Sequence, residues 1–435
     1  MKSIGGFFGR FFGSLEKDKS PQSDSQPTPS LPSPQKPAPV SSPSITDATA
    51  WPVGKVVGNI YEIRGVLGRG GMGLVYRAHD PATHRDIAVK VPLGRWEYDS
   101  TGTRRLVRFV DSPQAKEDLV DEVRNWIGLV HPHVVRAFDV IDDQTTDYQP
   151  AIFMDLCNGG SLADRIYRGR PLTLAAGLDV VIQICWAMEH LHGQKLVHRD
   201  LKSQNVLLVR ENNDGAGKAL VTDLGLAKAL GARGVEPPRA VGDADEAALW
   251  VTVSAAGGTP THMAPEQWIV GAHVGVASDV YAFGVLLYEV FCHQLPFAGG
   301  QDLRQWQQKH QQAAAPEPRN WNRKIPAGLA ELMQQCLAKR AESRPRDFGE
   351  LAERLGTLYR ETSSRDHWAL RGKPPIAALT AEAKKQQAGA KIRLGVGAHR
   401  RGDLERALRE MKEAEGLCLL LGDRVGLSAS PELLT

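Results

Sequence analysis

The residues best suited to chemistry form one octapeptide, His198-Arg-Asp-Leu-Lys-Ser-Gln-Asn205. Asp200 can accept or orient the proton of an attacking hydroxyl, which is the task of a general base. Lys202 can neutralise charge on a phosphoryl group in transfer, and Asn205 offers a carbonyl oxygen to a hard cation such as Mg²⁺. These side chains, in this order and between a helix and a strand, predict a phosphoryl-transfer site.

A second segment, Asp223-Leu-Gly225, follows an apolar stretch at 219–222 that is typical of a strand. In isolation this tripeptide means little. Shortly after the octapeptide, however, its carboxylate could bind magnesium between the β- and γ-phosphates of a nucleotide. We therefore expect Asn205 and Asp223 to form the metal site.

Lys90 ends the apolar segment Ile87-Ala-Val-Lys90. An ammonium group in such a run is costly to bury without an anionic partner. Glu122, on the flank of a helical stripe, is the candidate partner, and the pair would aim the ammonium at the α- and β-phosphates. The alternative is a lysine at a strand end whose ammonium reaches solvent.

The glycine-rich segment Gly68-Arg-Gly70-Gly-Met-Gly73-Leu-Val75 could cradle phosphates with its backbone N–H groups. Glycines suit this role because a Cβ would block the approach and positive φ can be required. The pattern alone is weak, since dinucleotide-binding folds share it. Here the following residues predict a strand, which favours a turn between two strands.

The elements that must position these residues follow from the apolar pattern. Alternating apolar residues and glycines from about residue 53 predict strands. An apolar stripe at 3.6-residue spacing predicts a helix after Lys116, and another helix is expected over 174–191. Strands first and helices later indicate an α+β body from 58 to 359.

Three further segments lie downstream: 258–266, 278–284 and Arg344-Pro345. Glu266 and Arg344 are expected to form a buried ion pair. Asp279 begins a stretch that is apolar nearly all round, which predicts a central, buried helix.

Together these segments resemble the eukaryotic-type (Hanks-type) serine/threonine protein kinases over residues 60–358, with every signature segment in order. The resemblance implies a bilobal α+β fold, with a five-stranded N-lobe that carries one helix and a mostly helical C-lobe. It implies ATP and Mg²⁺ between the lobes, and proteins as substrates. Lys202 is the form usual in serine/threonine rather than tyrosine kinases.

The resemblance also implies roles for single residues. Its catalytic set is Asp200, Lys202, Lys90, Glu122 and Thr259, with Thr259 hydrogen-bonded to Asp200 and Lys202. Its nucleotide contacts are Leu67, Gly68, Gly70, Gly73, Val75, Ala88, Lys90, Met154, Asp155, Cys157 and Leu207. Met154 is the implied gatekeeper, and the backbone of Asp155 and Cys157 is the implied hinge. Trp126, His198 and Leu224 would stack as a regulatory spine anchored on Asp279.

The chain departs from the family pattern at two residues and two insertions. Leu224 replaces the usual Phe, and His262 replaces the usual Tyr before Met-Ala-Pro-Glu. The insertions fall at 94–115 and 230–249. Arg199 and Lys228 would face the second, where a phosphate on Thr252 or Ser254 could activate the enzyme.

The flanks have other compositions. Residues 1–20 carry an aromatic face at helical spacing, weakened by glycines, which could dock on a membrane surface or stay a floppy tail. Residues 21–52 are rich in Pro and Ser and predict a disordered linker. Residues 381–435 predict a helical hairpin. Leu394, Gly395, Ala407 and Ala414 fit a tetratricopeptide-like repeat, which would have to pack on the preceding body, on a partner or on another copy. The alternative is an unspecialised pair of helices.

The overall composition excludes several classes. A net charge of +3 over 435 residues gives no basic excess for nucleic-acid binding. Five scattered cysteines, with no CxxC pair, fit a reducing cytoplasm. No stretch reaches the ~18 apolar residues of a membrane span, so we expect a cytoplasmic protein with peripheral contact at the inner membrane face.

Two alternatives to an active protein kinase stay open at this point. A pseudokinase scaffold would recruit partners through the linker, the insertions and the C-terminal helices. A small-molecule phosphotransferase would share the lysine and aspartate sites, but it usually lacks the Ala-Pro-Glu segment and the helix that begins at Asp279.

Overall fold

The computed structural model describes residues 50–70, 73–81, 83–98, 104–127, 129–169, 171–210, 217–224, 259–269, 271–297, 303–362, 388–389, 391–392, 395 and 404–421. The predictions for residues 1–20 and for most of the linker lie outside these residues. So do those for the insertion at 230–249 and for Lys228, Thr252 and Ser254.

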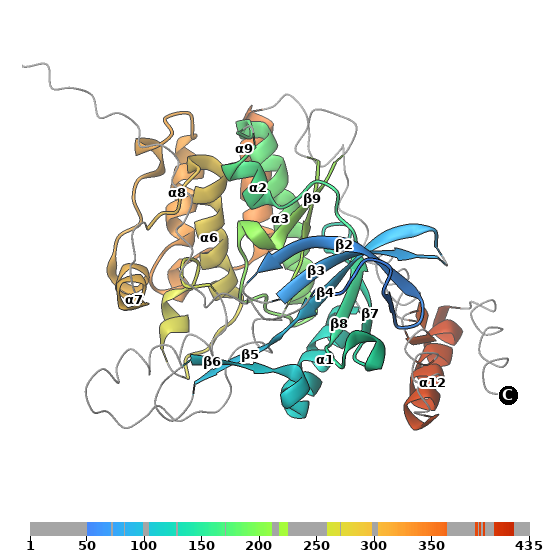
Figure 1. The fold of residues 1–435 in the computed structure, drawn as a ribbon. Helices are drawn as coiled ribbons and strands as arrows, with labels where there is room; N and C mark the ends of the chain where they lie inside the picture. The colour runs from blue at the N-terminus through green and yellow to red at the C-terminus, as the bar shows by residue number, and fades with distance from the viewer. Residues whose placement is uncertain are drawn as a thin grey trace, which may run out of the picture. The chain divides into compact units, whose positions relative to one another are not determined.

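The N-terminal part of the body is an antiparallel six-stranded sheet in the order β1-β2-β3-β4-β8-β7 (Figure 1). Its strands are β1 (Val56–Val57), β2 (Tyr61–Gly70), β3 (Gly73–Asp80), β4 (Arg85–Pro92), β7 (Ala137–Ile141) and β8 (Ala151–Asp155). Five strands were expected, and the sixth is the two-residue β1, which pairs with β2. Alternating apolar side chains of the sheet, Val57, Ile63, Tyr76, Val89 and Phe153 among them, form its own buried cluster.

Trp51 belongs to this lobe, although the sequence analysis assigned it to the linker. Its ring stacks on Tyr76 with centroids 4.9 Å apart, and its indole Nε1 donates a hydrogen bond to Asp147 at 2.7 Å. Only 8% of Trp51 is exposed. The folded body therefore includes residue 51 and begins before residue 58.

The predicted helix after Lys116 is α1 (Pro113–Ile127), and its apolar stripe is buried as expected. Trp126 fixes the helix by donating a hydrogen bond from Nε1 to the carbonyl oxygen of Val135 at 2.8 Å, just before β7. The insertion that precedes the helix contains an antiparallel hairpin of β5 (Gly94–Tyr98) and β6 (Arg104–Arg108). The sequence analysis marked this insertion without predicting its strands.

The C-terminal part of the body is mostly helical. Its helices are α2 (Leu162–Tyr167), α3 (Leu174–Gly193), α6 (Val276–Cys292), α7 (Leu303–Gln312), α8 (Ala327–Cys336) and α9 (Phe348–Thr362). Its strands are β9 (Val206–Val209) and β10 (Lys218–Val221). Short 3-10 helices occur in both parts of the body. The N-terminal part contains η1 (Phe109–Asp111) and η2 (Gln144–Thr146). The C-terminal part contains η3 (Ser203–Asn205), η4 (Pro265–Trp268), η5 (Pro318–Asn320) and η6 (Ala341–Ser343).

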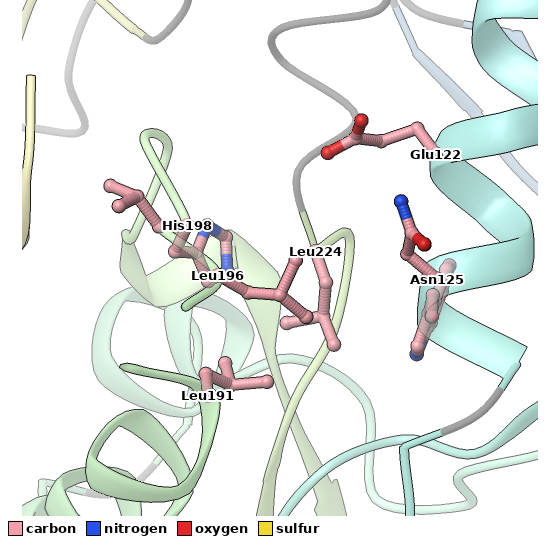
Figure 2. A pocket seen from close by; sticks show the side chains of 8 residues that line it. Glu122, Asn125, Leu191, Leu196, His198 and Leu224 are labelled. Atoms are coloured by element: carbon pink, nitrogen blue, oxygen red, sulfur yellow. The ribbon is translucent and has the colours of Figure 1, made fainter. Parts of the chain in front are cut away.

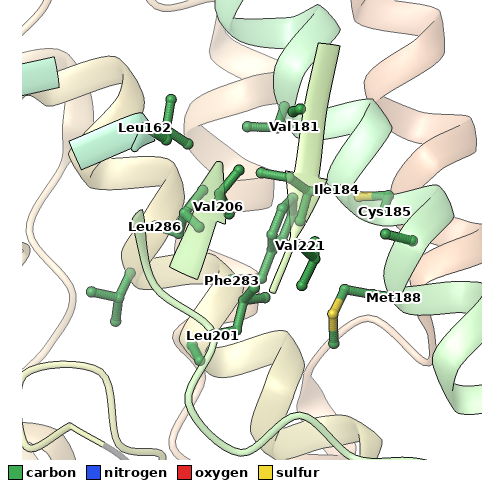
Figure 3. Close-up of a cluster of buried hydrophobic side chains, with 14 of the residues drawn as sticks. Leu162, Val181, Ile184, Cys185, Met188, Leu201, Val206, Val221, Phe283 and Leu286 are labelled. Atoms are coloured by element: carbon green, nitrogen blue, oxygen red, sulfur yellow. The ribbon is translucent and has the colours of Figure 1, made fainter. Parts of the chain in front are cut away.

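Helix α6 is the centre of this lobe, as its apolar sequence predicts. Every residue from Ser278 to Cys292 is buried, and Figure 3 shows Phe283 and Leu286 beside Val206 of β9 and Leu201. Helix α3 packs nearby against α9 and β10. Among the described residues α3 alone is long and apolar enough to cross a membrane, and most of that stretch is buried in the protein, as in a core helix.

The described part of the C-terminal segment is a helix, α12 (Leu404–Leu421), with a few helical residues before it. Ala407, Met411, Ala414 and Cys418 form its buried face. Gly395 lies so close that an added Cβ would stand 2.9 Å from Cγ of Met411. Of the predicted packing residues, Gly395 lies against Met411 and Ala407 and Ala414 are buried, while Leu394 lies outside the described residues.

Candidate active site

A two-stranded hairpin brings the two predicted metal ligands together. The strands β9 and β10 pair with Val206 opposite Val221. Asn205 precedes the first strand, Asp223 follows the second, and the backbone N–H of Thr222 donates to the carbonyl oxygen of Asn205 at 3.0 Å. Apolar strand residues thus fix two polar side chains at one end of the hairpin.

Asn205 is also oriented by Asp200. Its Nδ2 donates to the backbone oxygen of Asp200 at 2.8 Å and to the carboxylate Oδ2 at 3.1 Å. The amide nitrogen therefore faces Asp200, and the amide oxygen is the end that can bind a cation. An amide oxygen and the carboxylate of Asp223 are the hard oxygen donors that Mg²⁺ prefers.

This donor set fits magnesium held mainly by nucleotide phosphates and water. Among the described residues, no three His, Cys, Asp or Glu side chains are arranged to hold a metal ion. Mg²⁺ at nucleotide sites usually takes one or two protein oxygens and completes its shell from phosphates and water. Asn205 and Asp223 would be those two oxygens.

Asp200 is a buried carboxylate held by three side chains. Only 5% of the residue is exposed. Lys202 Nζ donates to Oδ2 at 2.6 Å and Thr259 Oγ1 donates to Oδ1 at 2.6 Å. Burial opposes ionisation, yet Lys202 and Thr259 hold the pKa of Asp200 below its ordinary value. The carboxylate is therefore ionised at neutral pH and able to accept a proton or a hydrogen bond.

Thr259 bridges the two functional groups, as the resemblance implied. Its hydroxyl contacts Asp200, and Lys202 Nζ donates to the same oxygen at 2.5 Å. The segment that begins at Thr259 is thereby tied directly to the octapeptide.

The backbone of the octapeptide is anchored on α6. Asp279, which is fully buried, accepts hydrogen bonds from the backbone N–H groups of His198 and Arg199, both at 2.8 Å. His192 Nε2 lies 2.8 Å from the same carboxylate. Arg199 has a φ of +69° and Asp223 a φ of +65°, conformations that persist where surrounding contacts determine them.

The predicted Lys90–Glu122 pair is not present among the described contacts. Lys90 is 7% exposed and forms its ion pair with Asp223, Nζ to Oδ1 at 2.7 Å. One close carboxylate offsets the cost of burying the ammonium group. Glu122 instead lines a small pocket between α1 and the loop at His198, and Figure 2 shows it there with Asn125 and Leu224.

The predicted spine residues meet at this same pocket. Trp126, His198 and Leu224 all line it, and Trp126 and Leu224 are almost completely buried. His198 is held in place by its Nε2, 3.0 Å from the carbonyl oxygen of Thr222. Leu224, which stands where the family usually has Phe, lines the pocket with an aliphatic side chain.

Most of the predicted nucleotide contacts lie on adjoining strands of the six-stranded sheet, while Leu207 lies on β9 and Cys157 follows β8. Ala88 on β4 pairs with Met154 on β8, and Val75 on β3 pairs with Lys90. In the same registers Ile87 pairs with Asp155, Gly68 with Val75 and Gly70 with Gly73. Leu67 is half exposed on β2, and Leu207 is partly buried on β9. Burial raises the pKa of the Cys157 thiol to about 11, so this thiol stays protonated at neutral pH.

Gly73 is required where the β2–β3 hairpin meets β4. Its φ is +142°, and an added Cβ would stand 2.1 Å from the carbonyl oxygen of Val91. Any larger residue would push the hairpin away from the strand that carries Lys90.

Sequence reasoning missed one polar cluster beside this site. Glu289, buried on α6, accepts hydrogen bonds from Tyr167, Ser203 and His262. A signal was present in the sequence: a single Glu interrupts a helix that is otherwise apolar, and a buried carboxylate requires donors.

Comparison with known proteins agrees with this geometry. The protein kinase domain family matches residues 61–353. The chain is 30% identical to the probable serine/threonine-protein kinase PknB of Lactococcus lactis over 70% of this chain and 43% of that protein. It is 33% identical to the DNA damage-responsive serine/threonine-protein kinase RqkA of Deinococcus radiodurans, over 79% of this chain and 43% of that protein.

A third relative is the serine/threonine-protein kinase PrkC of Bacillus subtilis, 29% identical over 66% of this chain and 38% of that protein. The chain thus spans less than half the length of these curated relatives. The match over most of the described body, together with the arrangement of Asp200, Lys202, Asn205 and Asp223, establishes the family. The chain belongs to the protein kinase domain family.

Proposed function

We propose that the protein transfers the γ-phosphoryl group of ATP to serine or threonine hydroxyls of other proteins. The observation that carries this proposal is the ionised Asp200, hydrogen-bonded at once by Lys202, Thr259 and Asn205. In protein kinases, a carboxylate in this position accepts the proton of the acceptor hydroxyl.

The geometry supports a simple sequence of events. The acceptor hydroxyl donates a hydrogen bond to Asp200, which orients its oxygen toward the γ-phosphorus. The new O–P bond forms as the bond to the β,γ-bridging oxygen breaks, ADP leaves, and the proton passes to Asp200. Lys202, 2.6 Å from Asp200, stabilises negative charge on the moving group.

Lys90 and the metal ligands would act on the nucleotide. Lys90, held by Asp223 at the end of β10, lies on the strand that also carries Ala88. Bound Mg²⁺ would neutralise phosphate charge beside Asn205 and Asp223. The proposed preference for Ser and Thr rests on Lys202 and on the similarity to proteins named as serine/threonine-protein kinases.

The test is transfer of labelled phosphate from Mg-ATP to a generic basic protein, followed by identification of the phosphorylated amino acids. Wild-type protein should label Ser and Thr, and the Asp223→Asn variant should not. Binding of partners without transfer by either form would point to a pseudokinase scaffold. Labelling of small acceptors alone would point to a small-molecule phosphotransferase.

We infer further that autophosphorylation at Thr252 or Ser254 activates the enzyme. A phosphate adds roughly −1.5 to −2 charge, and Arg199, beside Asp200, could pair with it. After incubation with Mg-ATP, mass spectrometry should find phosphate on one or both residues. The Thr252→Ala, Ser254→Ala double variant should then have a lower kcat, and an unchanged kcat would contradict this regulation.

The flanks support a proposed location and partner. Residues 1–20 would dock a cytoplasmic protein on the inner membrane face through their aromatic side chains. The C-terminal helical pair would bind another protein. Leu404 and Leu408 on α12 are 64% and 44% exposed, one helical turn apart, which is typical of a surface that a partner covers.

A further inference from the structure

Glu289, like Asp279, is a fully buried carboxylate near the active site. Its side chain has no exposed surface, and it lies on α6 among apolar residues. Oε1 accepts hydrogen bonds from Ser203 Oγ at 2.7 Å and from Tyr167 OH at 3.0 Å. Oε2 lies 2.9 Å from His262 Nε2 and 3.4 Å from the backbone nitrogen of Ser203.

These donors keep the carboxylate charged. Burial alone would favour the neutral acid. The imidazole of His262 and the hydrogen bonds from His262, Ser203 and Tyr167 outweigh burial and hold the pKa of Glu289 below its ordinary value. Removing one donor from a fully buried carboxylate leaves part of its charge uncompensated, which is costly.

The donors come from the two segments that must cooperate in transfer. Ser203 directly follows Lys202 and opens η3, which ends at Asn205. His262 closes a turn in which its backbone N–H donates to the carbonyl oxygen of Thr259 at 2.8 Å. Its imidazole Nδ1 lies 2.8 Å from Thr261 Oγ1, so both ring nitrogens have fixed partners.

A closed ring of contacts results. Thr259 contacts Lys202, Lys202 is followed by Ser203, Ser203 donates to Glu289, and Glu289 joins His262, whose turn returns to Thr259. One side of the ring is the octapeptide, and the other is the segment after Thr259. Glu289 on the rigid α6 is the fixed point to which both sides are attached.

We propose that His262 is a positioning residue for the protein substrate: through Glu289 it fixes the segment 259–264 relative to Ser203 and the catalytic Asp200. The proposal rests on the kinase function proposed above. An acceptor hydroxyl that reaches Asp200 must pass beside Thr259, which contacts that carboxylate. The proposed nucleotide contacts Val75, Ala88 and Met154 lie on the sheet instead. Loss of the His262 contact should therefore affect the protein substrate and spare the nucleotide.

The histidine acts through its N–H donor, which one matched pair of variants can isolate. His262→Tyr introduces the residue usual in the family resemblance, whose hydroxyl can donate to Glu289. His262→Phe has the same ring and no donor. The two variants differ by one oxygen atom, so packing changes are largely shared. His79→Phe is the control, because it removes a His–carboxylate contact, 3.2 Å from Asp86, at a distant surface of the sheet.

Steady-state kinetics of the full chain should separate the variants. His262→Phe should lower kcat/KM for a protein substrate about tenfold or more, the cost of one hydrogen bond to a charged group, with KM for ATP unchanged. His262→Tyr and His79→Phe should stay near wild type. Equal losses in the Phe and Tyr variants, or a loss that falls on the KM for ATP, would overturn the proposal.

A second measurement does not depend on enzymatic activity, so it tests the proposal even if the kinase assay detects no transfer. Amide hydrogen exchange in His262→Phe should become faster both at 259–264 and at 203–205, with β4 unchanged. Faster exchange at 259–264 alone would show that the ring does not couple the two segments. If His262→Phe does not fold, His262→Gln, which retains a donor, should be compared with His262→Leu in the same exchange experiment. A wild-type protein without transfer would refute the proposed function but leave this test intact.

Discussion

At the scale of single residues, the active site consists of charges that burial would penalise and that neighbours hold in place. Lys90 pairs with Asp223, and Asp200 pairs with Lys202. Each pair removes two charges from water, so it is stable only if its geometry is good and its remaining donors are satisfied. The proposed phosphoryl transfer requires these same charges at fixed positions. The pairing therefore both stabilises the buried charges and holds them in place.

Lys90→Met should reduce phosphoryl transfer at least about 10²-fold, comparable to the loss of one preorganised electrostatic contact. Methionine has a similar length and can fill the space beside Val75 on the neighbouring strand. The rate should be measured at saturating nucleotide, with binding of a fluorescent nucleotide recorded separately. Lys116→Met, which removes a surface ion pair to Asp142 at 3.4 Å, is the control. Normal turnover of Lys90→Met with nucleotide bound would contradict the assigned role.

The sequence predicted which residues gather at the site better than it predicted their partners. Asp200, Lys202, Asn205 and Asp223 lie within short segments whose strands are evident from apolar residues. Whether Glu122 can reach Lys90 depends on the position of α1 relative to β4. A local sequence pattern does not determine how two separate elements are placed. Glu122 was therefore the wrong partner for Lys90 in this structure.

At the scale of elements, the turns that border the active site are joined to α6 by buried ions. Arg344, fully buried after η6, binds Glu266 of η4 through both guanidinium nitrogens at 2.8 Å. Ser278 at the start of α6 donates to the same carboxylate at 2.6 Å. This pair was predicted from the sequence and is confirmed. Bidentate geometry of this kind gives strength and fixes orientation.

Glu266→Gln should lower the free energy of unfolding by about 3–5 kcal/mol at neutral pH, because Arg344 would stay buried without a full counter-charge. Burial opposes ionisation of Glu266, but Arg344 and Ser278 hold its pKa below the ordinary 4.5. The stabilisation is therefore complete above pH 4.5 and is lost as the pH falls through the lower, folded value. Denaturant unfolding across pH should show the wild-type advantage shrinking only below pH 4.5.

The exposed pair of Arg64 and Glu62, 3.0 Å apart, provides the control. Glu62→Gln should change the free energy of unfolding by less than about 1 kcal/mol. A Glu266→Gln variant as stable as Glu62→Gln would show that the buried pair contributes nothing. A wild-type advantage that persists unchanged to pH 3 would contradict the lowered pKa.

Helices and strands could be predicted from the sequence where a single apolar pattern runs through the whole element. The apolar stripe of α1 and the all-round apolar α6 appear in the structure as expected. The β5–β6 hairpin and β1 were not predicted. Strand β1 has two residues, too few for a periodic signal, and besides β2 it contacts η2, which lies far along the chain.

At the scale of the whole molecule, a folded catalytic body lies between two segments of different composition. The α+β class followed from the order of strands before helices, and the bilobal arrangement was implied by the family resemblance. The flanking segments show only a biased composition and apolar residues at helical spacing. Their roles depend on the surfaces that they bind, and the sequence of the chain does not identify those surfaces.

Deleting the segment before Ser44 should reduce binding to vesicles that contain anionic lipid. In the full chain, Phe7, Phe8 and Phe11 can insert at the interface, with Lys2 and Arg10 near the headgroups. Sedimentation should compare the full chain with the shortened protein, and vesicles of neutral lipid serve as the reference. Equal pelleting of both proteins would favour an N-terminal tail without membrane affinity.

The most direct test of the central claim is the kcat of Asp200→Asn at saturating Mg-ATP and protein substrate. Asparagine keeps the shape and can still meet Lys202 and Thr259, but it cannot accept the hydroxyl proton. The account predicts a kcat lower by about 10²-fold or more, with KM for ATP unchanged, while Asp121→Asn on the exposed face of α1 stays at the wild-type rate. A kcat for Asp200→Asn equal to that of wild type would contradict it.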